Sequence, residues 1–468
     1  MAHLLAELSA VRLFVYDFSQ HLNFDIRALA PGSAACSVQC AGASTGKVYD
    51  GQEAADLCNY GYGRLLPLAP EHPLAGLAWS NNDGDTDVYH LFHRLLNSTR
   101  RVHDPLAANV FFLAAPFYQI RHKPYPRYEA CGLHHNSGDW AAILDWLGQQ
   151  PAWRRSGGRD HFTFLTKPYV WSRKGAPLAA SGPAAWADHP VHAQLMANVV
   201  KATHWGVQAD ERAVAMPFST FVHAHRGVDL PRALDRLFAA PRRHAMSYIG
   251  GMWRGGAKGP YALKQKNWST KRRVGAWCHR EATCHALFTD GPPDARPPPG
   301  QRAPPALTDV FPHCGNDSMP SRVVAAWPRL GAAARTCGYP QLTYLESEFC
   351  LTPPGDAPSR RGLFDALLMG CIPVLFEPLT ALYPWFWSRP ALERIAVVAS
   401  PRDLRDGGGG LAARLAAITL ERRGAMRAAI REVWPTLQYS YDESADHADA
   451  VDVLLAHVLK PGVGAVLE

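Results

Sequence analysis

The sequence predicts an α/β protein built from two domains, each organised around a parallel sheet. Its length of 468 residues exceeds what one hydrophobic core usually supports, because domains typically contain roughly 100–200 residues. Short apolar runs rich in β-branched and aromatic residues alternate with segments of helical periodicity, and this alternation is typical of a parallel sheet. A stretch rich in arginine and proline, residues 224–243, is interpreted as the connection between the halves.

In the first half of the chain, four apolar runs are predicted as buried strands and two segments as helices. The strands are Val11–Phe18, Asn109–Ala115, His161–Leu165 and Val214–Pro217. The helices are Val88–Leu96, which Asp85 or Thr86 can cap, and Trp140–Leu147, which ends near Pro151.

In the second half, the predicted strands are Ala245–Ile249, Phe349–Thr352 and Ile372–Phe376. Prolines force a turn after Thr352, and Ser359 can then cap a helix over residues 360–369. Gly370 follows, where a left-handed C-terminal residue belongs. The proline-rich residues 290–306 and the glycines at 407–410 are expected to form loops.

Composition and charge exclude several classes of protein. The chain is 47% hydrophobic and 19% charged, which excludes disordered and coiled-coil proteins. Its net charge of +7 is spread along the sequence rather than clustered, so we expect no nucleic-acid partner. No run of 18 apolar residues is present, so a membrane anchor, if the protein has one, is expected to be absent from this chain.

Three glycosylation sequons, at Asn97, Asn267 and Asn316, favour a secretory compartment. Cysteines gathered between residues 278 and 350 favour the same compartment, and disulfides are expected among them with the pairing left open. Cys371 lies in a predicted buried strand and is expected to be a free core thiol. The cysteines and histidines match no ordinary zinc spacing, so no metal site is expected.

The most informative segment is FCLTPPGDAPSRRGLFDALLMGCIPVLF, residues 349–376. It predicts strand, loop, helix and strand, with the loop at the carboxyl end of a parallel strand, where α/β sheets bind ligands. Ser359, Arg360 and Arg361 lie at the start of the helix, whose unpaired N–H groups attract anions. Arginine suits phosphate, and Asp365 is placed to reach a ribose hydroxyl. The alternative is that both arginines form ion pairs on a solvated helix end.

This segment resembles the nucleotide-sugar-binding motif of the exostosin-like family, glycosyltransferase family 47, and is most similar to its plant xyloglucan galactosyltransferase branch. Further pieces follow in family order, among them VRLFVYDF, HDPLAANVFFLAAPFY, MPFSTFVH and TYLESEFCL. The resemblance implies a GT-B fold, in which two Rossmann-like domains face each other across a cleft. We expect an acceptor domain at residues 1–235, a donor domain at 236–445, and a C-terminal helix and tail at 446–468.

The resemblance also implies an inverting enzyme that uses a UDP-sugar and a glycan acceptor and needs no metal cofactor. It implies a type II membrane protein of the Golgi lumen, with homo- or hetero-oligomers among transferases possible. Members of the family carry a basic residue after the first strand of the donor domain, and here it corresponds to Lys271, Arg272 or Arg273. Arg273 is the candidate for binding the nucleotide-sugar. The alternative is that these residues form a solvated basic loop.

Three residues are candidates for the base that takes the acceptor's proton. Asp17 follows the first strand, and Asp160 and His161 begin another. The alternatives are a turn or cap at Asp17 and a structural network at Asp160 and His161. Two departures from the family, Tyr89 before Phe92-His93 and Gln119 after PFY, lie in the acceptor half.

The predicted function is therefore transfer of a sugar, most simply galactose, from a UDP-sugar to a polysaccharide or glycoprotein glycan. The same fold acting on UDP-xylose, UDP-arabinose or UDP-glucuronate is one alternative. A pseudoenzyme that binds the donor and serves as a partner subunit of an active transferase is the other.

Overall fold

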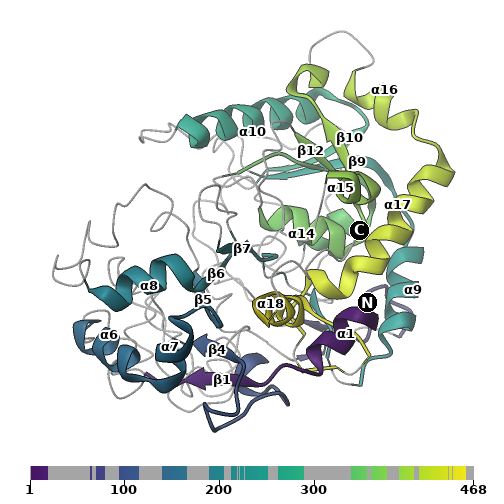
Figure 1. The fold of residues 1–468 in the computed structure, drawn as a ribbon. Helices are drawn as coiled ribbons and strands as arrows, with labels where there is room; N and C mark the ends of the chain where they lie inside the picture. Colours follow the sequence, from purple (N-terminus) through teal and green to yellow (C-terminus); the bar gives the residue numbers. More distant parts are fainter. Residues whose placement is uncertain are drawn as a thin grey trace, which may run out of the picture.

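The structure is a computed structural model of the chain, and its fold is shown in Figure 1. The residues that it describes are 2–18, 64–65, 70–79, 94–114, 140–165, 189–204, 212–218, 220, 222–225, 227–250, 262–288, 339–355, 360–376, 389–404, 410–440, 442–444 and 446–459. The predicted loops at 290–306 and 407–409, and the departures at Tyr89 and Gln119, lie outside these residues.

The first sheet is parallel throughout, as the sequence predicted. Its strands, in spatial order, are β1 (Leu13–Tyr16), β4 (Val110–Leu113), β5 (His161–Leu165), β6 (Val200–Thr203) and β7 (Ala213–Ala215). The helices that accompany them are α6 (Trp140–Gln149), α7 (Pro151–Ser156) and α8 (Pro190–Asn198). β1 and β4 are each almost fully buried, as expected of strands covered on both faces.

The second sheet is also parallel, in the order β10-β9-β11-β12-β13. Its strands are β9 (His244–Gly250), β10 (Cys284–Phe288), β11 (Ser347–Thr352), β12 (Ile372–Phe376) and β13 (Val397–Ala399). Its helices are α10 (Ala262–Arg280), α13 (Tyr339–Leu345), α14 (Arg361–Leu368), α15 (Arg389–Ile395), η6 (Pro401–Leu404), α16 (Leu411–Ala416) and α17 (Leu420–Val433). Because the order of strands reverses at β9, the carboxyl ends of β9 and β11 form a topological switch point, the usual ligand position in open α/β sheets.

Several elements were not anticipated, among them one strand of the first sheet and a small antiparallel sheet. Strand β6 is hidden in the sequence because Lys201 interrupts its apolar run, although this lysine is only 1% exposed. A small antiparallel sheet joins β2 (Arg64–Leu65), β3 (Ala78–Trp79) and β8 (Val222–His223), each too short for a sequence signal.

The predicted connection at 224–243 contains a helix, α9 (Leu230–Ala239). Asp229 caps it by accepting a hydrogen bond from the Arg232 amide at 3.1 Å, and Pro231 is tolerated in the first turn because no helical partner is lost there. Its buried residues Leu230, Ala233, Leu234 and Leu237 form one apolar face.

Two disulfides are present among the described residues. Cys278–Cys284 joins the end of α10 to β10, within the predicted range. Cys350–Cys371 ties β11 to the residue before β12. The expectation of a free thiol at Cys371 was therefore wrong: burial in a strand does not exclude pairing when a neighbouring parallel strand brings a second cysteine alongside.

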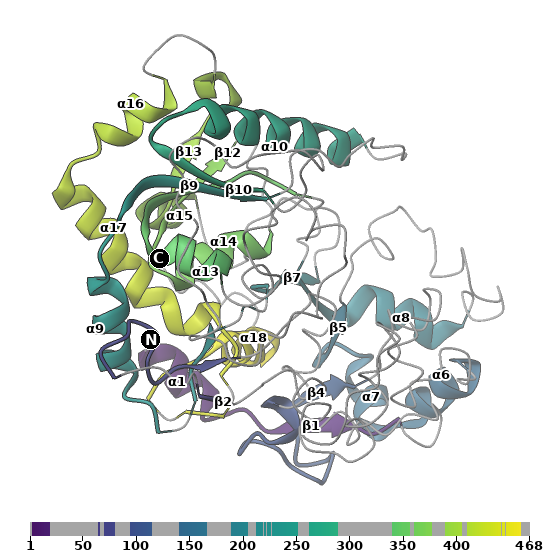
Figure 2. The same ribbon diagram turned by 180° about the vertical axis from the view of Figure 1, so that it is seen from behind.

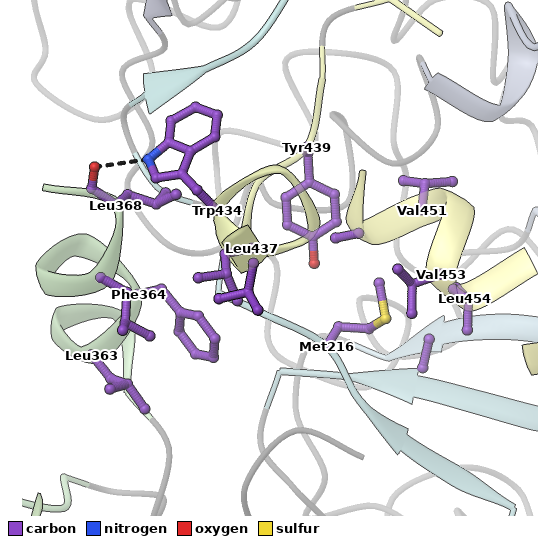
Figure 3. Close-up of a cluster of buried hydrophobic side chains, with 14 of the residues drawn as sticks. Met216, Leu363, Phe364, Leu368, Trp434, Leu437, Tyr439, Val451, Val453 and Leu454 are labelled. Carbon is purple, nitrogen blue, oxygen red and sulfur yellow. Dashed lines mark hydrogen bonds between the residues drawn. The ribbon is translucent and has the colours of Figure 1, made fainter. Parts of the chain in front are cut away.

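The two sheets are joined by a buried core that includes the C-terminal segment (Figures 1 and 2). After α17 the chain passes through η7 (Trp434–Leu437) to α18 (Ala450–Leu459), which packs against α1 (Ala2–Leu8) and β4. Figure 3 shows this core, in which Trp434 donates to the Leu368 carbonyl of α14 at 2.9 Å. Met216, after β7, and Val451, Val453 and Leu454 of α18 complete it.

A buried ionic cluster fastens the same segment to the first half of the chain. Arg94, 1% exposed, lies 3.2 Å from Asp449 and 3.0 Å from Asp452. Arg100 contacts Asp452 and Glu443, and Glu443 also accepts from the Thr99 amide at 2.6 Å. These groups span more than 340 residues of sequence, so they hold the C-terminal segment in place.

Candidate functional site

The helix α14 follows the carboxyl end of β11, as predicted, and its apolar side is buried. Its N-cap residue is Arg360 rather than Ser359, and the Arg360 side chain makes no cap hydrogen bond. Ser359 itself lies outside the described residues. The Arg360 side chain therefore does not cap the first-turn amides, whereas the Asp229 side chain caps those of α9.

The other end of α14 is closed tightly, and here the sequence prediction is confirmed. Gly370 has a φ of +65°, its amide bonds to the Leu367 carbonyl at 3.0 Å, and the Cys371 amide bonds to the Ala366 carbonyl at 2.9 Å. This is a Schellman motif. Arg242 adds a hydrogen bond to the Met369 carbonyl at 3.0 Å and one to the Leu345 carbonyl at the end of α13.

Arg360 lies at the topological switch point of the second sheet. Its Nη2 donates to the carbonyl of Ile249, in β9, at 2.7 Å, and its Nη1 approaches the carbonyl of Pro353, just past β11, at 3.4 Å. The guanidinium therefore spans the carboxyl ends of the two strands between which the strand order reverses.

Two buried tyrosines lie near this arginine, and an aspartate lies within electrostatic reach of one of them. Tyr248 and Tyr344 are 0% and 1% exposed. Burial raises the pKa of Tyr344 above its usual value; nearby Arg360 opposes this effect, while Asp365 and Tyr248 add to it. Both charged groups thus lie within electrostatic reach of this phenol, which stays neutral.

Arg361, the first residue of α14, and Asp365 form an ion pair one helical turn apart. Arg361 Nε lies 3.4 Å from Asp365 Oδ2, with the side chains 23% and 7% exposed. The alternative of an ion pair at this helix end therefore describes Arg361, whereas Arg360 bonds to main-chain carbonyls. Arg273 lies on α10, where its side chain is exposed.

The residues predicted as bases belong to the first sheet and lie at opposite ends of it. Asp17 directly follows β1, at the carboxyl end, and is exposed. Asp160 and His161 lie at the amino end of β5, with His161 fully buried.

Asp160 and His161 form a hydrogen-bonded network with Tyr16. His161 Nδ1 lies 2.6 Å from Asp160 Oδ1, and His161 Nε2 lies 3.2 Å from the Tyr16 hydroxyl. Burial lowers the pKa of His161 despite the neighbouring carboxylate. Burial raises the pKa of Asp160, but hydrogen bonds from His161 and Ser156 outweigh it, so this pKa lies below its ordinary value.

The remaining predictions concern glycosylation, metals and membranes. Asn97 is exposed, Asn267 lies in α10, and Asn316 is outside the described residues. In the described part of the chain, no three histidine, cysteine, aspartate or glutamate side chains gather as metal ligands would. Across the same residues, no helix combines the length and the hydropathy that crossing a bilayer requires.

Five residues of the site were not predicted from the sequence: Tyr248, Gly250, Tyr344, Arg242 and Gly362. Of these, Gly362 is the one that the sequence could have indicated, because a glycine inside the first turn of a helix usually has a packing reason. A methyl group at Gly362 would lie 2.9 Å from the Tyr344 hydroxyl and 3.1 Å from Arg360 Nη2. The tyrosines contribute through tertiary packing alone.

Comparison with known proteins matches the exostosin GT47 domain to residues 9–274 and 302–403. A xyloglucan-specific galacturonosyltransferase of Arabidopsis thaliana is 26% identical over 416 residues, covering 87% of this chain and 53% of the relative. A probable xyloglucan galactosyltransferase (GT20) from the same plant is 25% identical, covering 79% and 56%. The xyloglucan galactosyltransferase XLT2, also of Arabidopsis, is 22% identical, covering 96% and 74%.

The chain thus spans about half the length of the first two relatives. The matched domain covers most of the chain, including the whole first sheet, α14, and every strand of the second sheet except β10. It begins before β1, resumes before α13 and ends within η6, so it contains the switch point at β9 and β11. The resemblance inferred from the sequence is confirmed: this chain belongs to the exostosin GT47 family.

Proposed function

We propose that the protein is an inverting glycosyltransferase of GT-B fold that transfers a sugar from a UDP-sugar to a polysaccharide. The observation that carries this proposal is the position of the Arg360-Arg361 pair at the switch point of a parallel sheet, in a chain of the exostosin GT47 family. Two parallel sheets joined through a returning C-terminal helix are consistent with a GT-B arrangement, with the domains at residues 1–235 and 236–445 and the tail at 446–468.

The donor is assigned to the carboxyl end of the second sheet. The diphosphate lies against the start of α14, where backbone amides and arginine supply positive charge. Arg360, Arg361 and Asp365 gather at this point; Ser359 precedes them in the sequence, and Arg273 on α10 is the further basic candidate. No metal is required for such a site, because fixed donors can stabilise the diphosphate as its charge grows.

The reaction is a single displacement. The acceptor hydroxyl oxygen attacks the anomeric carbon, the bond from that carbon to the diphosphate oxygen breaks, UDP leaves with the electron pair, and a base takes the hydroxyl proton. Asp17 is the preferred base because it is exposed and follows β1 at its carboxyl end. Asp160 and His161 are the alternatives, but burial of His161 keeps it from an acceptor in this conformation.

The donor sugar proposed first is galactose, and the acceptor is a xyloglucan-like polysaccharide or a glycoprotein glycan. The names of the relatives support galactose and also its C6-oxidised form, galacturonate. UDP-xylose, UDP-arabinose and UDP-glucuronate remain in the set of donors to be tested. The proposed location is the Golgi lumen, consistent with two disulfides in the described residues; anchoring and oligomers with other transferases form part of the proposal.

A panel of UDP-sugars tests the proposal. We expect one donor to raise the melting temperature and to release UDP when a xyloglucan oligosaccharide is supplied. Stabilisation by a donor without turnover on any acceptor would favour the pseudoenzyme alternative. If no UDP-sugar and no UDP binds, the donor site is wrong.

A further inference from the structure

The adjacent arginines at the start of α14 differ in what their guanidinium groups contact. Arg360 bonds to main-chain carbonyls of two strands, whereas Arg361 pairs with Asp365 on its own helix. Two neighbouring side chains of one type therefore have separate structural roles, which the sequence motif alone does not distinguish.

Arg360 donates to main-chain carbonyls at the carboxyl ends of two strands. Carbonyls at the carboxyl ends of parallel strands have no further ladder partner, and a buried carbonyl without a hydrogen bond is costly. Arg360 reaches one such carbonyl at Ile249 and a second at Pro353. The planar guanidinium group carries several N–H donors, so it is suited to bridging two acceptors at a fixed separation.

The space that Arg360 occupies is kept open by two glycines. A methyl group at Gly362 would lie 3.1 Å from Arg360 Nη2 and 3.2 Å from its Nε. A methyl group at Gly250 would lie 3.4 Å from Nη2 and 2.8 Å from the Tyr248 hydroxyl. Carbon atoms this close would displace the guanidinium or the tyrosines, so the surrounding main chain is shaped around the arginine.

From this geometry we propose that Arg360 is a positioning residue, which bridges β9 to β11 and fixes the start of α14, and that Arg361 is the arginine that contacts the diphosphate. The division of roles rests on the proposed function for Arg361 and on the observed contacts for Arg360. Pairing with Asp365 is compatible with an anion contact, because a guanidinium carries five N–H donors in its plane.

The test compares Arg360→Gln with Arg361→Gln, since both changes remove one positive charge from the same helix end. UDP affinity is measured by calorimetry at several salt concentrations, and melting temperature and steady-state kinetics are measured on the same preparations. For Arg361→Gln we expect UDP affinity to fall about tenfold or more, as for loss of a charge-assisted hydrogen bond. The salt dependence of UDP binding should weaken, and the melting temperature should stay within about 2 °C.

For Arg360→Gln we expect the melting temperature to fall by about 3–8 °C, with UDP affinity within about threefold of the wild type and an unchanged salt dependence. The kcat should fall about tenfold, because the displaced helix end no longer holds its donors at the leaving oxygens. Arg360→Lys, which can still reach one carbonyl, should recover most of this kcat. A merely structural arginine would change the melting temperature and leave kcat intact.

Gly362→Ala is the second variant, because it keeps both arginines and displaces only the Arg360 guanidinium and Tyr344. We expect it to reproduce the effects of Arg360→Gln. If Arg360→Gln weakens UDP binding and its salt dependence as much as Arg361→Gln does, Arg360 is a ligand and the proposed division is wrong. If the wild type binds no UDP, the donor function fails, while the melting temperatures of Arg360→Gln and Gly362→Ala still decide whether Arg360 bridges the strands.

Discussion

Within the described residues, each parallel sheet has a polar cluster that includes predicted site residues, and these two clusters lie at opposite ends of their strands. In the second sheet, Arg360 lies at the carboxyl ends of β9 and β11 beside a half-buried Arg361. In the first sheet, His161 lies at the amino end of β5, stacked on Phe111 at 4.7 Å and edge-on to Trp153 at 5.0 Å between ring centroids.

The comparison teaches that residue type alone does not identify a reactive group. Asp160 and His161 have the composition of a catalytic pair, yet aromatic rings surround the imidazole and its Nε2 is engaged by Tyr16. Ligands of parallel sheets meet the carboxyl ends of strands because loops and helix N-termini gather there. By that criterion Asp17 and Arg361 are the preferred candidates, and we expect Asp160 and His161 to support the sheet.

The largest expected effect is at Asp17. If it is the base, Asp17→Asn should lower kcat by about 10²–10⁴-fold, the usual contribution of a general base, with UDP affinity unchanged. Steady-state transfer to a xyloglucan oligosaccharide and calorimetry with UDP measure the two quantities. Wild-type transfer by this variant would exclude Asp17 as the base.

Asp160→Asn is the matched control for Asp17→Asn. It weakens hydrogen bonds to a charged group, so we expect unfolding to require about 1.5–3 kcal/mol less free energy, with kcat within about threefold of the wild type. A loss of kcat at Asp160 that equals the loss at Asp17 would reverse the assignment of the two carboxylates.

The next effect concerns the ionic cluster that joins the two regions. Arg94→Ala leaves Asp449 buried without its arginine and leaves Asp452 with Arg100 alone. Breaking such a buried pair typically costs about 3–5 kcal/mol. Urea denaturation at pH 7 measures the change. Adding Asp449→Asn to Arg94→Ala should recover part of the loss, because one uncompensated charge is removed; no recovery would mean that packing, rather than charge, dominates here.

Much of the fold was predictable because local sequence and tertiary packing agree. β5 and β12 were predicted with their observed bounds, since their apolar runs end at turn residues. β6 was missed because Lys201 looks like a surface residue, and α9 was missed because arginines and prolines suggested a linker although four apolar residues share one face. In both cases long-range packing decides what the local composition leaves ambiguous.

The candidate site was predictable only in part. The Arg-Arg pair and Gly370 carry local signals, because helix ends have specific requirements for charge and for left-handed backbone. The roles of Arg360, Tyr344 and Tyr248 depend on which strands are neighbours, and a sequence of parallel strands does not state their spatial order. The disulfide at Cys371 was misjudged for the same reason.

The third effect is a loss of stability in acid that arises from the second sheet. His285 stacks on His244 with ring centroids 4.4 Å apart; burial, and secondarily His244, lowers its pKa from 6.5 to about 4. The unfolded chain therefore binds more protons between these values, so stability is present above pH 6.5 and is lost as pH falls toward 4. At about 1.4 kcal/mol per pKa unit, the loss reaches roughly 3 kcal/mol by pH 4.

His285→Phe should remove most of this dependence of the free energy of unfolding on pH, as measured by urea denaturation at pH 7 and pH 4.5. His244 also faces Glu346 at 3.9 Å, and Arg243 lies beside both. His244→Gln should raise the pKa of His285 toward its unfolded value, because the neighbouring positive charge is gone, and so make the loss of stability in acid smaller. If neither variant alters the pH dependence, the acid sensitivity lies elsewhere, with buried His161 of the first sheet as the next candidate.

The smallest expected loss of stability is at Gly370, which ends α14 on the side opposite the candidate site. Gly370→Ala places a methyl group 2.9 Å from Arg242 Nη2 and 3.0 Å from the Phe238 ring, at a φ of +65°. Backbone strain alone costs about 1–2 kcal/mol, and the contact with Arg242 adds to it. Gly227→Ala isolates the strain, because Gly227 has a φ of +89° with no atom within 4 Å of the added methyl. Chemical denaturation should give a lower free energy of unfolding for Gly370→Ala than for Gly227→Ala. Equal losses would show that Arg242 moves aside without destabilising the protein.

Gly424→Ala, in the open middle of α17, should instead stabilise the protein by up to about 1 kcal/mol.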